Sequence, residues 1–322
     1  MSAVTIAGAG AFGTALALVL ARAGAEVTLL ARDAARARAI RAAGRNSLRL
    51  PGHSLPAELV VTADGAALSA PIVLLAVPAQ RLGGFLRAHR PALAGAGALV
   101  ACAKGIDAET GLGPAGLIAA ALPGACPALL SGPGFADEIA AGLPTALTLA
   151  CADEARGVAL QRALSGPALR LYRTRDIAGV ELGGALKNVI AIAAGLLIGR
   201  GLGESARAAL LTRGFAEMIR LAEARGGQAR TLAGLSGLGD LMLTAMSDRS
   251  RNFRHGRALG AGAAPDAGVT VEGVATAAAV MRLAGERGIE MPINSEVAAI
   301  TAGTRGVGEA VTALMSRPLR AE

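Results

Sequence analysis

The sequence predicts an α/β protein in which an N-terminal Rossmann-type sheet, doubly wound and parallel, is followed by an all-α domain. In the first half, short apolar runs alternate with helical stretches, as in βαβ units. Beyond about residue 176 the strand signals fade and long Ala- and Leu-rich helical patterns take over. A chain of 322 residues also exceeds what one hydrophobic core usually organises. We therefore predict a nucleotide-binding domain at 1–177 and a helical substrate-binding domain at 178–322.

Several of the expected strands are apolar throughout, which is typical of strands covered on both faces. They are Val4–Ala7, Glu26–Ala31, Ile72–Val77, Ala98–Cys102, Pro127–Leu130 and Thr145–Ala150. The expected helices are Gly13–Ala23 in the first half and Glu204–Ala224, Glu272–Arg287 and Pro292–Ala302 in the second, with an exposed loop at Gly260–Gly268.

Several classes of protein do not fit the composition. The most continuous apolar helix, 189–198, is too short for the roughly 18 to 20 residues of a membrane span. The first 23 residues lack the basic region of a signal peptide, so we expect a cytoplasmic protein without a membrane span. The three cysteines, Cys102, Cys126 and Cys151, have no paired spacing and are expected to be reduced.

The charge favours small anionic ligands over nucleic acid. The net charge is +8, but the arginines are scattered and are not gathered with aromatic side chains into a stacking surface. We expect neither nucleic acid nor a metal ion as a ligand. The oligomeric state stays open, with a homodimer as one alternative.

Lysine is unusually rare. Of the 32 Lys and Arg residues only Lys104 and Lys187 are lysines, which suggests a drift of composition toward Arg. An ammonium can lose its proton within a tunable pH range, whereas a guanidinium stays charged, so a lysine that persists is a candidate for proton transfer. By composition alone, chance survival on a solvated face is an equal alternative.

A glycine-rich turn predicts dinucleotide binding. Gly8, Gly10 and Gly13 follow the first expected strand and open a helix, with a second strand about 20 residues further on. Gly8 would make the tight turn, Gly10 would let the backbone approach a pyrophosphate, and Gly13 would allow close packing of helix and strand. The helix N-terminus would then face the phosphates. The alternative is a purely structural turn.

The second strand ends in Arg32 and Asp33. A carboxylate at this place binds a ribose 2′-hydroxyl, whereas an arginine can pair with a 2′-phosphate. Because Arg32 comes first, we expect NADPH to be favoured, with NADH open because Asp33 is adjacent. A solvated strand-end charge is the alternative for Arg32.

Polar residues follow other expected strands and helices. Lys104 and the segment 131–138 come after strands, where ligands of open α/β sheets bind. Lys187 lies in an apolar helix whose small residues leave room for a ligand, so we expect both lysines to face one cleft between the domains. The run 247–252 joins hydroxyl, guanidinium and amide donors, which suits a phosphate, although a helix cap is the alternative.

The chain resembles bacterial NAD(P)-dependent glycerol-3-phosphate dehydrogenase over nearly its whole length. The motifs that carry the resemblance are GAGAFGTALA at 8–17, NSLRLPG at 46–52, AVPAQ at 76–80, KGI at 104–106, SGPGFADEIA at 131–140, ELGGALKNVIAIAAG at 181–195, GLGDL at 237–241, SRNF at 250–253, VEGVAT at 271–276 and MPI at 291–293.

The resemblance implies reversible reduction of dihydroxyacetone phosphate to sn-glycerol 3-phosphate, which feeds glycerophospholipid synthesis. It implies that Lys187 exchanges a proton with the substrate oxygen and that Lys104 polarises the carbonyl. The remaining residues that it implies for the substrate are Gly132, Gly134, Asp240, Ser250, Arg251 and Asn252. Those that it implies for the cofactor are Gly8, Gly10, Ala11, Phe12, Gly13, Arg32, Lys104, Ala136, Arg251, Thr270 and Glu272.

Three departures from the family pattern affect this transfer. Gly134 stands where a hydroxyl residue is usual, Arg49 replaces an aromatic residue, and the stretch before Glu272 is short, which affects the alignment of Thr270. Another two-domain β-hydroxyacid or ketopantoate-type reductase is the alternative enzyme. A catalytically inactive NADPH-binding regulator is an alternative of another class.

Overall fold

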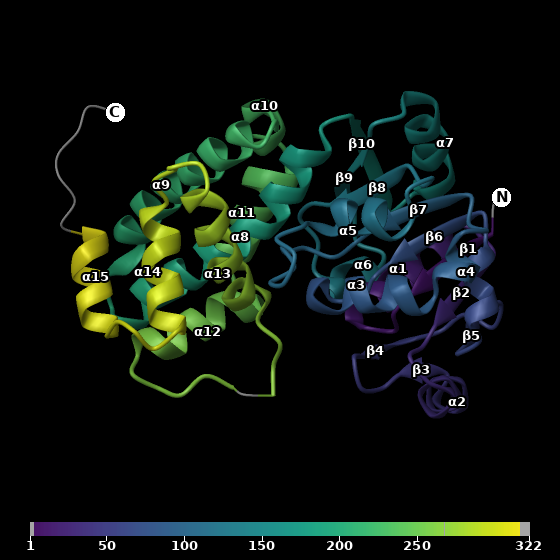
Figure 1. Ribbon diagram of the computed structural model, residues 1–322. Helices are drawn as coiled ribbons and strands as arrows, with labels where there is room; N and C mark the ends of the chain where they lie inside the picture. The colour runs from purple at the N-terminus through teal and green to yellow at the C-terminus, as the bar shows by residue number, and fades with distance from the viewer. Residues whose placement is uncertain (1–2, 267, 316–322) are drawn as a thin grey trace. The chain divides into compact units, whose positions relative to one another are not determined.

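The computed structural model describes residues 3–266 and 268–315, and the chain divides into two compact units (Figure 1). The sheet unit comprises Met1–Lys104 and Leu112–Glu181. The helical unit comprises Leu182–Glu322 together with the short segment Gly105–Gly111. The segment directly after Lys104 therefore packs with the helices, and its Ile106 is buried in their core.

The sheet unit is built on an eight-stranded sheet with the order β10-β9-β8-β7-β6-β1-β2-β5. Its strands are β1 Val4–Ala7, β2 Val27–Leu30, β5 Val60–Thr62, β6 Ile72–Leu75, β7 Ala98–Ala101, β8 Pro127–Ser131, β9 Thr145–Cys151 and β10 Leu169–Thr174. A separate two-stranded hairpin, β3 Arg45–Asn46 and β4 Leu50–Ser54, follows the second helix. The unit's helices are α1 Ala11–Arg22, α2 Ala34–Ala43, α3 Ala79–Ala88, α4 Arg90–Leu93, α5 Pro114–Ala121, α6 Ala136–Ala141 and α7 Glu154–Leu164, with a 3-10 helix at Gly65–Ser69.

Helices cover both faces of the sheet. Neighbouring residues of a strand point to opposite faces, so they pack in different cores. Ile6 of β1 packs in a core with α1, α2, α6 and α7, whereas Ala7 packs in a second core with α3, α4 and α5. Strands β1, β6 and β7 are four residues long and buried along their whole length, as expected for strands covered on both faces. The Rossmann-type, doubly wound fold class is thereby confirmed.

The sheet departs from the prediction of an all-parallel arrangement at one place. Strands β8 and β9 are antiparallel, with Leu130 opposite Leu149. The connection between them holds only the six-residue α6, and the chain turns back without crossing over the sheet. Strands β5 and β10 were not predicted, because β5 has three residues and β10 alternates buried and exposed side chains.

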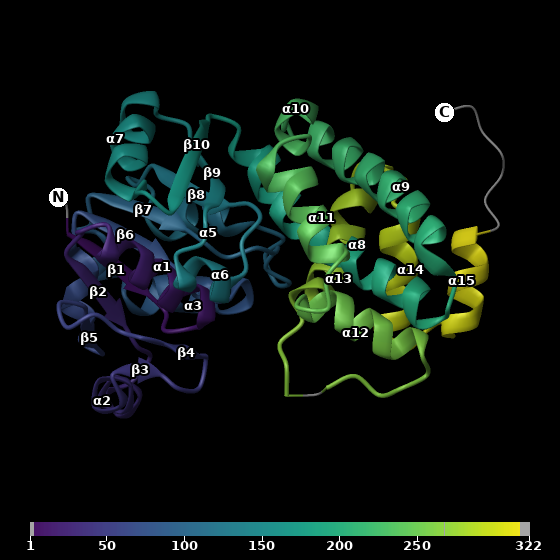
Figure 2. The same cartoon turned by 180° about the vertical axis from the view of Figure 1, so that it is seen from behind.

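The helical unit packs around α8, which lies among the other helices in both views (Figures 1 and 2). Its helices are α8 Ile177–Gly199, α9 Gly203–Ala224, α10 Ala229–Leu232, a π-helix at Leu235–Gly239, α11 Asp240–Ala245, α12 Arg251–Gly260, α13 Glu272–Gly285, α14 Pro292–Thr301 and α15 Val307–Met315. Helices α8 and α12 approach closely through glycines. A Cβ atom added at Gly256 would lie 1.9 Å from the carbonyl oxygen of Ile192.

Helix α8 is longer than the sequence predicted. It has 23 residues and is apolar enough to cross a membrane by length and composition, so the prediction that this apolar helix is too short was wrong. In the structure 89% of its most apolar window is buried inside the protein. That burial is what the central helix of a packed helical core requires.

Candidate functional site

The glycine-rich turn after β1 has the geometry that a dinucleotide requires. Gly8 has φ +117°, and a Cβ atom there would lie 2.6 Å from the carbonyl oxygen of Ala76. A Cβ atom at Gly13 would lie 2.1 Å from the carbonyl oxygen of Gly8. Gly10, in contrast, faces open space, with no atom within 4 Å of an added Cβ. The turn therefore fits a pyrophosphate, because close backbone approach is left open at one position.

Helix α1 begins at Ala11, two residues earlier than predicted, so Ala11 and Phe12 lie in its first turn. Gly10 is the N-cap residue, and as a glycine it has no side chain that could cap the helix. The first amides of a helix have no intrahelical acceptor and carry the positive end of its dipole. They are the groups that bind phosphate in this fold.

Asn46 holds this turn in place, a role that the sequence did not predict. Its side chain is fully buried and donates to the carbonyl oxygen of Ala9 at 3.0 Å and to the hydroxyl of Thr14 at 2.8 Å. Its amide oxygen accepts a hydrogen bond from the guanidinium of Arg36. The turn is thus connected to the hairpin and to α2 by hydrogen bonds of the buried Asn46 side chain.

Arg32 and Asp33 follow β2 and interact with each other. Arg32 Nε lies 2.8 Å from Asp33 Oδ2, and the Arg32 side chain is 82% exposed. Asp33 is the N-cap of α2 and accepts from the backbone amide of Arg36 at 2.7 Å. This amide, followed by the Arg32 side chain, holds the pKa of Asp33 below its ordinary value. Both carboxylate oxygens are engaged, whereas the arginine lies in solvent.

Lys104 follows β7 and lies beside Gly132. Its Nζ atom donates to the Gly132 carbonyl oxygen at 2.8 Å, and Gly132 has φ +139°, which favours glycine. The structure thus brings together two of the predicted substrate residues. Burial raises the pKa of the neighbouring Cys102 thiol to about 12, although Lys104 opposes this, so the thiol stays neutral.

Two other predicted positions lie further along the same connection. A Cβ atom at Gly134 would lie 3.0 Å from Ile139 Cδ1, so this position is closely packed although it carries no side chain. Ala136 is the first residue of α6.

Lys187 lies in a buried polar cluster of the helical unit. Its side chain is 8% exposed, and Nζ donates to Asp240 Oδ1 at 2.8 Å and to Thr244 Oγ1 at 2.6 Å. Asp240 begins α11 directly after the π-helix, a feature that is frequent at functional sites. A buried ion pair is a costly way to stabilise a fold, because both charges lose their hydration. This pair is therefore a candidate for chemistry.

Asn252 joins three helices next to this cluster. Its side-chain amide donates to Asn188 Oδ1 at 2.9 Å, and its oxygen accepts from the amide of Gly273 at 3.0 Å. Ser250 is the N-cap of α12 and accepts from the amide of Phe253 at 3.2 Å, so the helix-cap alternative describes its observed contact.

Arg251 and Glu272 begin α12 and α13. Burial raises the pKa of Glu272, and the charge of Arg251 opposes this shift. Within the part of the chain that the structure describes, Glu272 Oε2 is buried and has no hydrogen-bond partner. A buried acceptor of this kind suits a ligand that brings a donor. Thr270 precedes the helix and is exposed.

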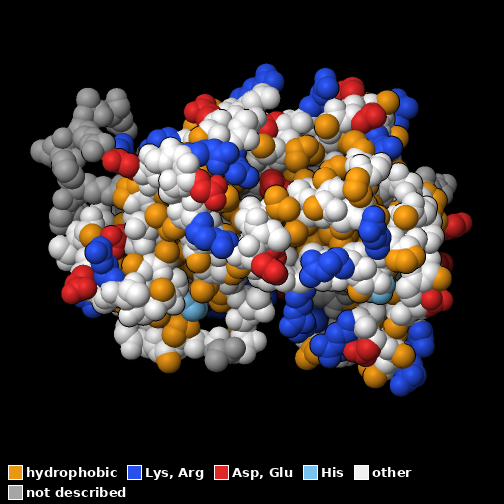
Figure 3. Space-filling model, in the orientation of Figure 1, with side chains coloured by type: hydrophobic (Ala, Val, Ile, Leu, Met, Phe, Trp, Pro, Cys, Tyr) orange, Lys and Arg blue, Asp and Glu red, His pale blue; other side chains and the backbone are white. Residues whose placement is uncertain are grey.

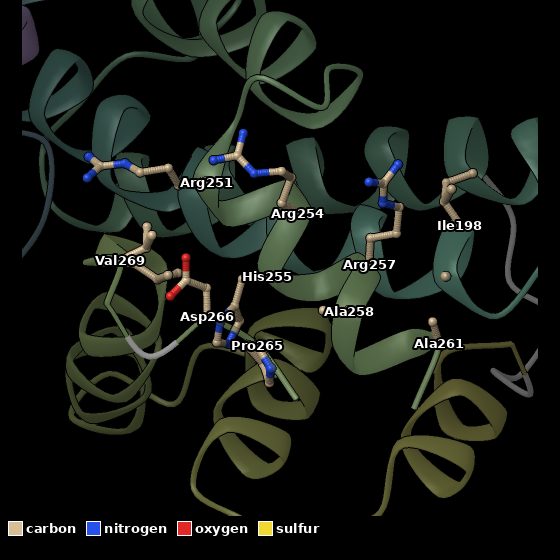
Figure 4. A pocket seen from close by; sticks show the side chains of 12 residues that line it. Ile198, Arg251, Arg254, His255, Arg257, Ala258, Ala261, Pro265, Asp266 and Val269 are labelled. Carbon is tan, nitrogen blue, oxygen red and sulfur yellow. The ribbon is translucent and has the colours of Figure 1, made fainter. Parts of the chain in front are cut away.

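A cavity of about 550 Å³ lies beside Arg251, between α12 and the loop that follows it (Figure 4). Arg254, His255 and Asp266 also line it, and burial lowers the pKa of His255. Lys187 does not line this cavity, so the cavity lies beside Arg251 and not at the predicted proton donor.

The comparisons with known proteins agree with the motifs. The sequence models for the N-terminus and the C-terminus of NAD-dependent glycerol-3-phosphate dehydrogenase match residues 3–157 and 176–312. A glycerol-3-phosphate dehydrogenase (NAD(P)+) of Cereibacter sphaeroides is 59% identical over 319 residues, covering 99% of this chain and 100% of the relative. The chain belongs to this family. A relative of the same name from Paracoccus denitrificans is 57% identical over 99% of both chains.

Solved structures extend the family likeness to the fold. A crystal structure of glycerol-3-phosphate dehydrogenase from Coxiella burnetii has a TM-score of 0.93 and 37% identity, covering 98% of this chain and 99% of its own. A ketopantoate reductase from Ralstonia eutropha shares the fold at 20% identity, with a TM-score of 0.65 and coverage of 96% and 99%. Family membership and NAD(P) dependence, both predicted from the motifs, are confirmed.

Three residues of the described site were missed in the sequence. Thr244 lies four residues after Asp240 on one helix face, a spacing that could have revealed it. Asn188 directly follows Lys187. Asn46 opens the NSLRLPG motif, but its contacts could not be predicted, because Thr14 and Ala9 lie 32 and 37 residues away in the chain.

Proposed function

We propose that this protein reversibly reduces dihydroxyacetone phosphate to sn-glycerol 3-phosphate, with NADPH or NADH as the hydride donor. The observation that carries the proposal is the buried contact of Lys187 with Asp240 and Thr244. The relatives that match the whole chain carry the name of this activity.

Reduction of a ketone needs a hydride at carbon and a proton at oxygen. A bound NAD(P)H supplies the hydride. We assign the proton to Lys187, whose ammonium form is stabilised by Asp240 and whose direction is fixed by Thr244 Oγ1. In the reverse reaction the same amine, in its neutral form, would take the alcohol proton.

Lys104 is assigned to the carbonyl oxygen as a second positive group. Negative charge builds on this oxygen as hydride arrives, and a positioned cation stabilises it. The Gly132 carbonyl oxygen orients the Lys104 ammonium at 2.8 Å. The folded protein therefore already orients the Lys104 ammonium before the substrate binds.

The substrate phosphate is assigned to the start of α12. Arg251 offers a forked donor that matches phosphate, and Ser250 and Asn252 flank it. The helix N-terminus adds backbone amides and a positive dipole end. Gly132, Gly134 and Asp240 complete the proposed substrate contacts.

The cofactor is assigned to the glycine-rich turn, with Ala11 and Phe12 in the first turn of α1. Further proposed cofactor contacts are Arg32, Lys104, Ala136, Arg251, Thr270 and Glu272. Because Arg32 is exposed and both oxygens of Asp33 are engaged, we propose a preference for NADPH. We also propose a cytoplasmic location and a role in glycerophospholipid synthesis. A homodimer stays a prediction, which size-exclusion chromatography with light scattering would test.

The decisive experiment is an assay of the purified protein with a substrate panel. Oxidation of NADPH is followed with dihydroxyacetone phosphate, with dihydroxyacetone and with ketopantoate. We expect turnover with the phosphorylated ketone and a kcat/KM at least about a hundredfold lower without the phosphate, since two charge-assisted hydrogen bonds are lost. Turnover with ketopantoate alone would favour the alternative reductase. Cofactor binding without any turnover would contradict enzymatic function.

A further inference from the structure

Arginines gather around the end of β2 and the hairpin that follows α2. Arg32 follows β2, Arg36 lies in the first turn of α2, and Arg49 directly precedes β4. The turn that carries Arg49 is closed by a hydrogen bond from its amide to the Asn46 carbonyl oxygen at 3.1 Å. Figure 3 shows basic side chains concentrated over the region of α2, β3 and β4.

Hydrogen bonds of Asn46 connect Arg36 to the glycine-rich turn. The Arg36 guanidinium donates to the side-chain oxygen of Asn46, and the same Asn46 side chain donates to Ala9 and Thr14. Arg36 is therefore anchored to the turn that is proposed to bind pyrophosphate. Because Asn46 and Arg49 share one hairpin, Arg49 is brought to the same place.

The arginines lie close enough to affect one another. The pKa of Arg36 is lowered first by burial and then by the charges of Arg49 and Arg32. Asp33 opposes these charges, but its two oxygens already accept from the Arg36 amide and from Arg32. Among the described residues, Arg49 has no ion-pair partner. Three positively charged guanidinium groups thus act on one another beside a single carboxylate, and a bound anion would offset their mutual repulsion.

The position of the group indicates which anion. It lies beyond the carboxyl end of β2, the strand that follows the glycine-rich turn and its helix. In dinucleotide-binding sheets this place is occupied by the 2′ position of the adenosine ribose. A phosphate there carries up to two negative charges and accepts forked hydrogen bonds from arginine.

We propose that Arg36 and Arg49 join Arg32 in binding the 2′-phosphate of NADPH, and that Arg49 is a specificity-determining residue for the cofactor. The inference rests on the proposed dinucleotide site, but it does not depend on which ketone is reduced. Asn46 is then a positioning residue, because it holds Arg36 at a fixed place beside the glycine-rich turn.

The test measures cofactor binding without turnover. Binding of NADPH and of NADH is titrated by the fluorescence of the reduced nicotinamide ring, which protein side chains do not contribute to. Competition by 2′,5′-ADP and by 5′-AMP isolates the 2′-phosphate from the rest of the cofactor. The variants are Arg49→Ala, which is exposed, and Arg36→Ala, with Arg38→Ala as a control that removes an exposed arginine of α2 outside the group.

We expect Arg49→Ala to raise the dissociation constants of NADPH and 2′,5′-ADP by about tenfold or more. The dissociation constants of NADH and 5′-AMP should change less than about twofold. Arg38→Ala should change none of the four by more than about twofold. If Arg36→Ala does not fold because Asn46 loses its partner, Arg49→Ala alone decides. If Arg49→Ala lost affinity for NADPH and NADH equally, or lost affinity for neither, the inference would be overturned.

The two proposals fail in different ways. If Arg49→Ala loses its selectivity for NADPH but the parent protein does not turn over dihydroxyacetone phosphate, this inference stands and the proposed activity is wrong. Turnover with NADPH and an unchanged selectivity in Arg49→Ala would do the reverse.

Discussion

The glycine-rich turn of the sheet unit and the Lys187 cluster of the helical unit build their sites in opposite ways. The turn works through backbone, and its three glycines lie within six consecutive residues of the sequence. The cluster works through side chains, and Lys187 and Asp240 are 53 residues apart in the chain. The comparison teaches that the proposed pyrophosphate site is encoded locally, whereas the proposed proton transfer depends on packing of distant helices.

The largest expected effect comes from Lys187→Arg. The variant keeps the positive charge but not the compact, ionisable amine, so we expect kcat to fall by about 10²- to 10⁴-fold. The dissociation constant of NADPH should change less than about threefold, because the glycine-rich turn is left unaltered. Steady-state kinetics and cofactor titration measure the two quantities separately.

Thermal unfolding is the necessary control, because the larger guanidinium must fit a buried site beside Asp240. A folded Lys187→Arg protein with near-normal kcat would remove Lys187 from the proton-transfer step. Equal losses in kcat and in cofactor affinity would mean that the two regions are not as independent as the comparison supposes.

The next effect distinguishes two glycines of the turn. Gly13→Ala places a Cβ atom 2.1 Å from the Gly8 carbonyl oxygen, so the turn must shift. We expect it to cost about 1 to 3 kcal/mol of unfolding free energy, together with cofactor affinity. Gly10→Ala meets open space at an ordinary φ of −78°, so stability should change by less than about 0.5 kcal/mol.

Cofactor affinity should nevertheless fall at least about tenfold in Gly10→Ala, because the methyl group occupies the approach of the pyrophosphate. Chemical denaturation and NADPH titration of both variants provide the measurement. Normal cofactor binding by a stable Gly10→Ala protein would contradict the assignment of this turn as the pyrophosphate site.

The same contrast explains what the sequence could predict. The glycine-rich turn was predicted residue by residue, since its pattern of glycines follows a strand and opens a helix. Asp240 was reached only through the family resemblance, and Thr244 and Asn46 were missed, because their partners are set by tertiary packing. The antiparallel direction of β9 has no local signal. The start of α8 was concealed by glycines that pack closely, as at Gly183, where an added Cβ would lie 2.8 Å from the Ser236 carbonyl oxygen.

The smallest expected effect is a pH dependence that belongs to the helical unit alone. Burial raises the pKa of Glu272 above its ordinary value of 4.5, so ionising this carboxyl costs more in the folded than in the unfolded protein. Stability from this group is full below pH 4.5 and falls as pH rises through the raised value. Glu272→Gln cannot ionise, so its Tm relative to the parent protein should be higher at about pH 7 than at about pH 4.

Glu286→Gln, an exposed change at the end of the same helix, is the matched control and should show no such difference. If the Tm difference between Glu272→Gln and the parent protein were the same at both pH values, burial would not destabilise the ionised carboxyl. The Tm difference between Gly10→Ala and the parent protein should meanwhile stay constant over this range, because a methyl group does not titrate. A shared pH dependence of both variants would therefore break the distinction between a backbone site and a side-chain site.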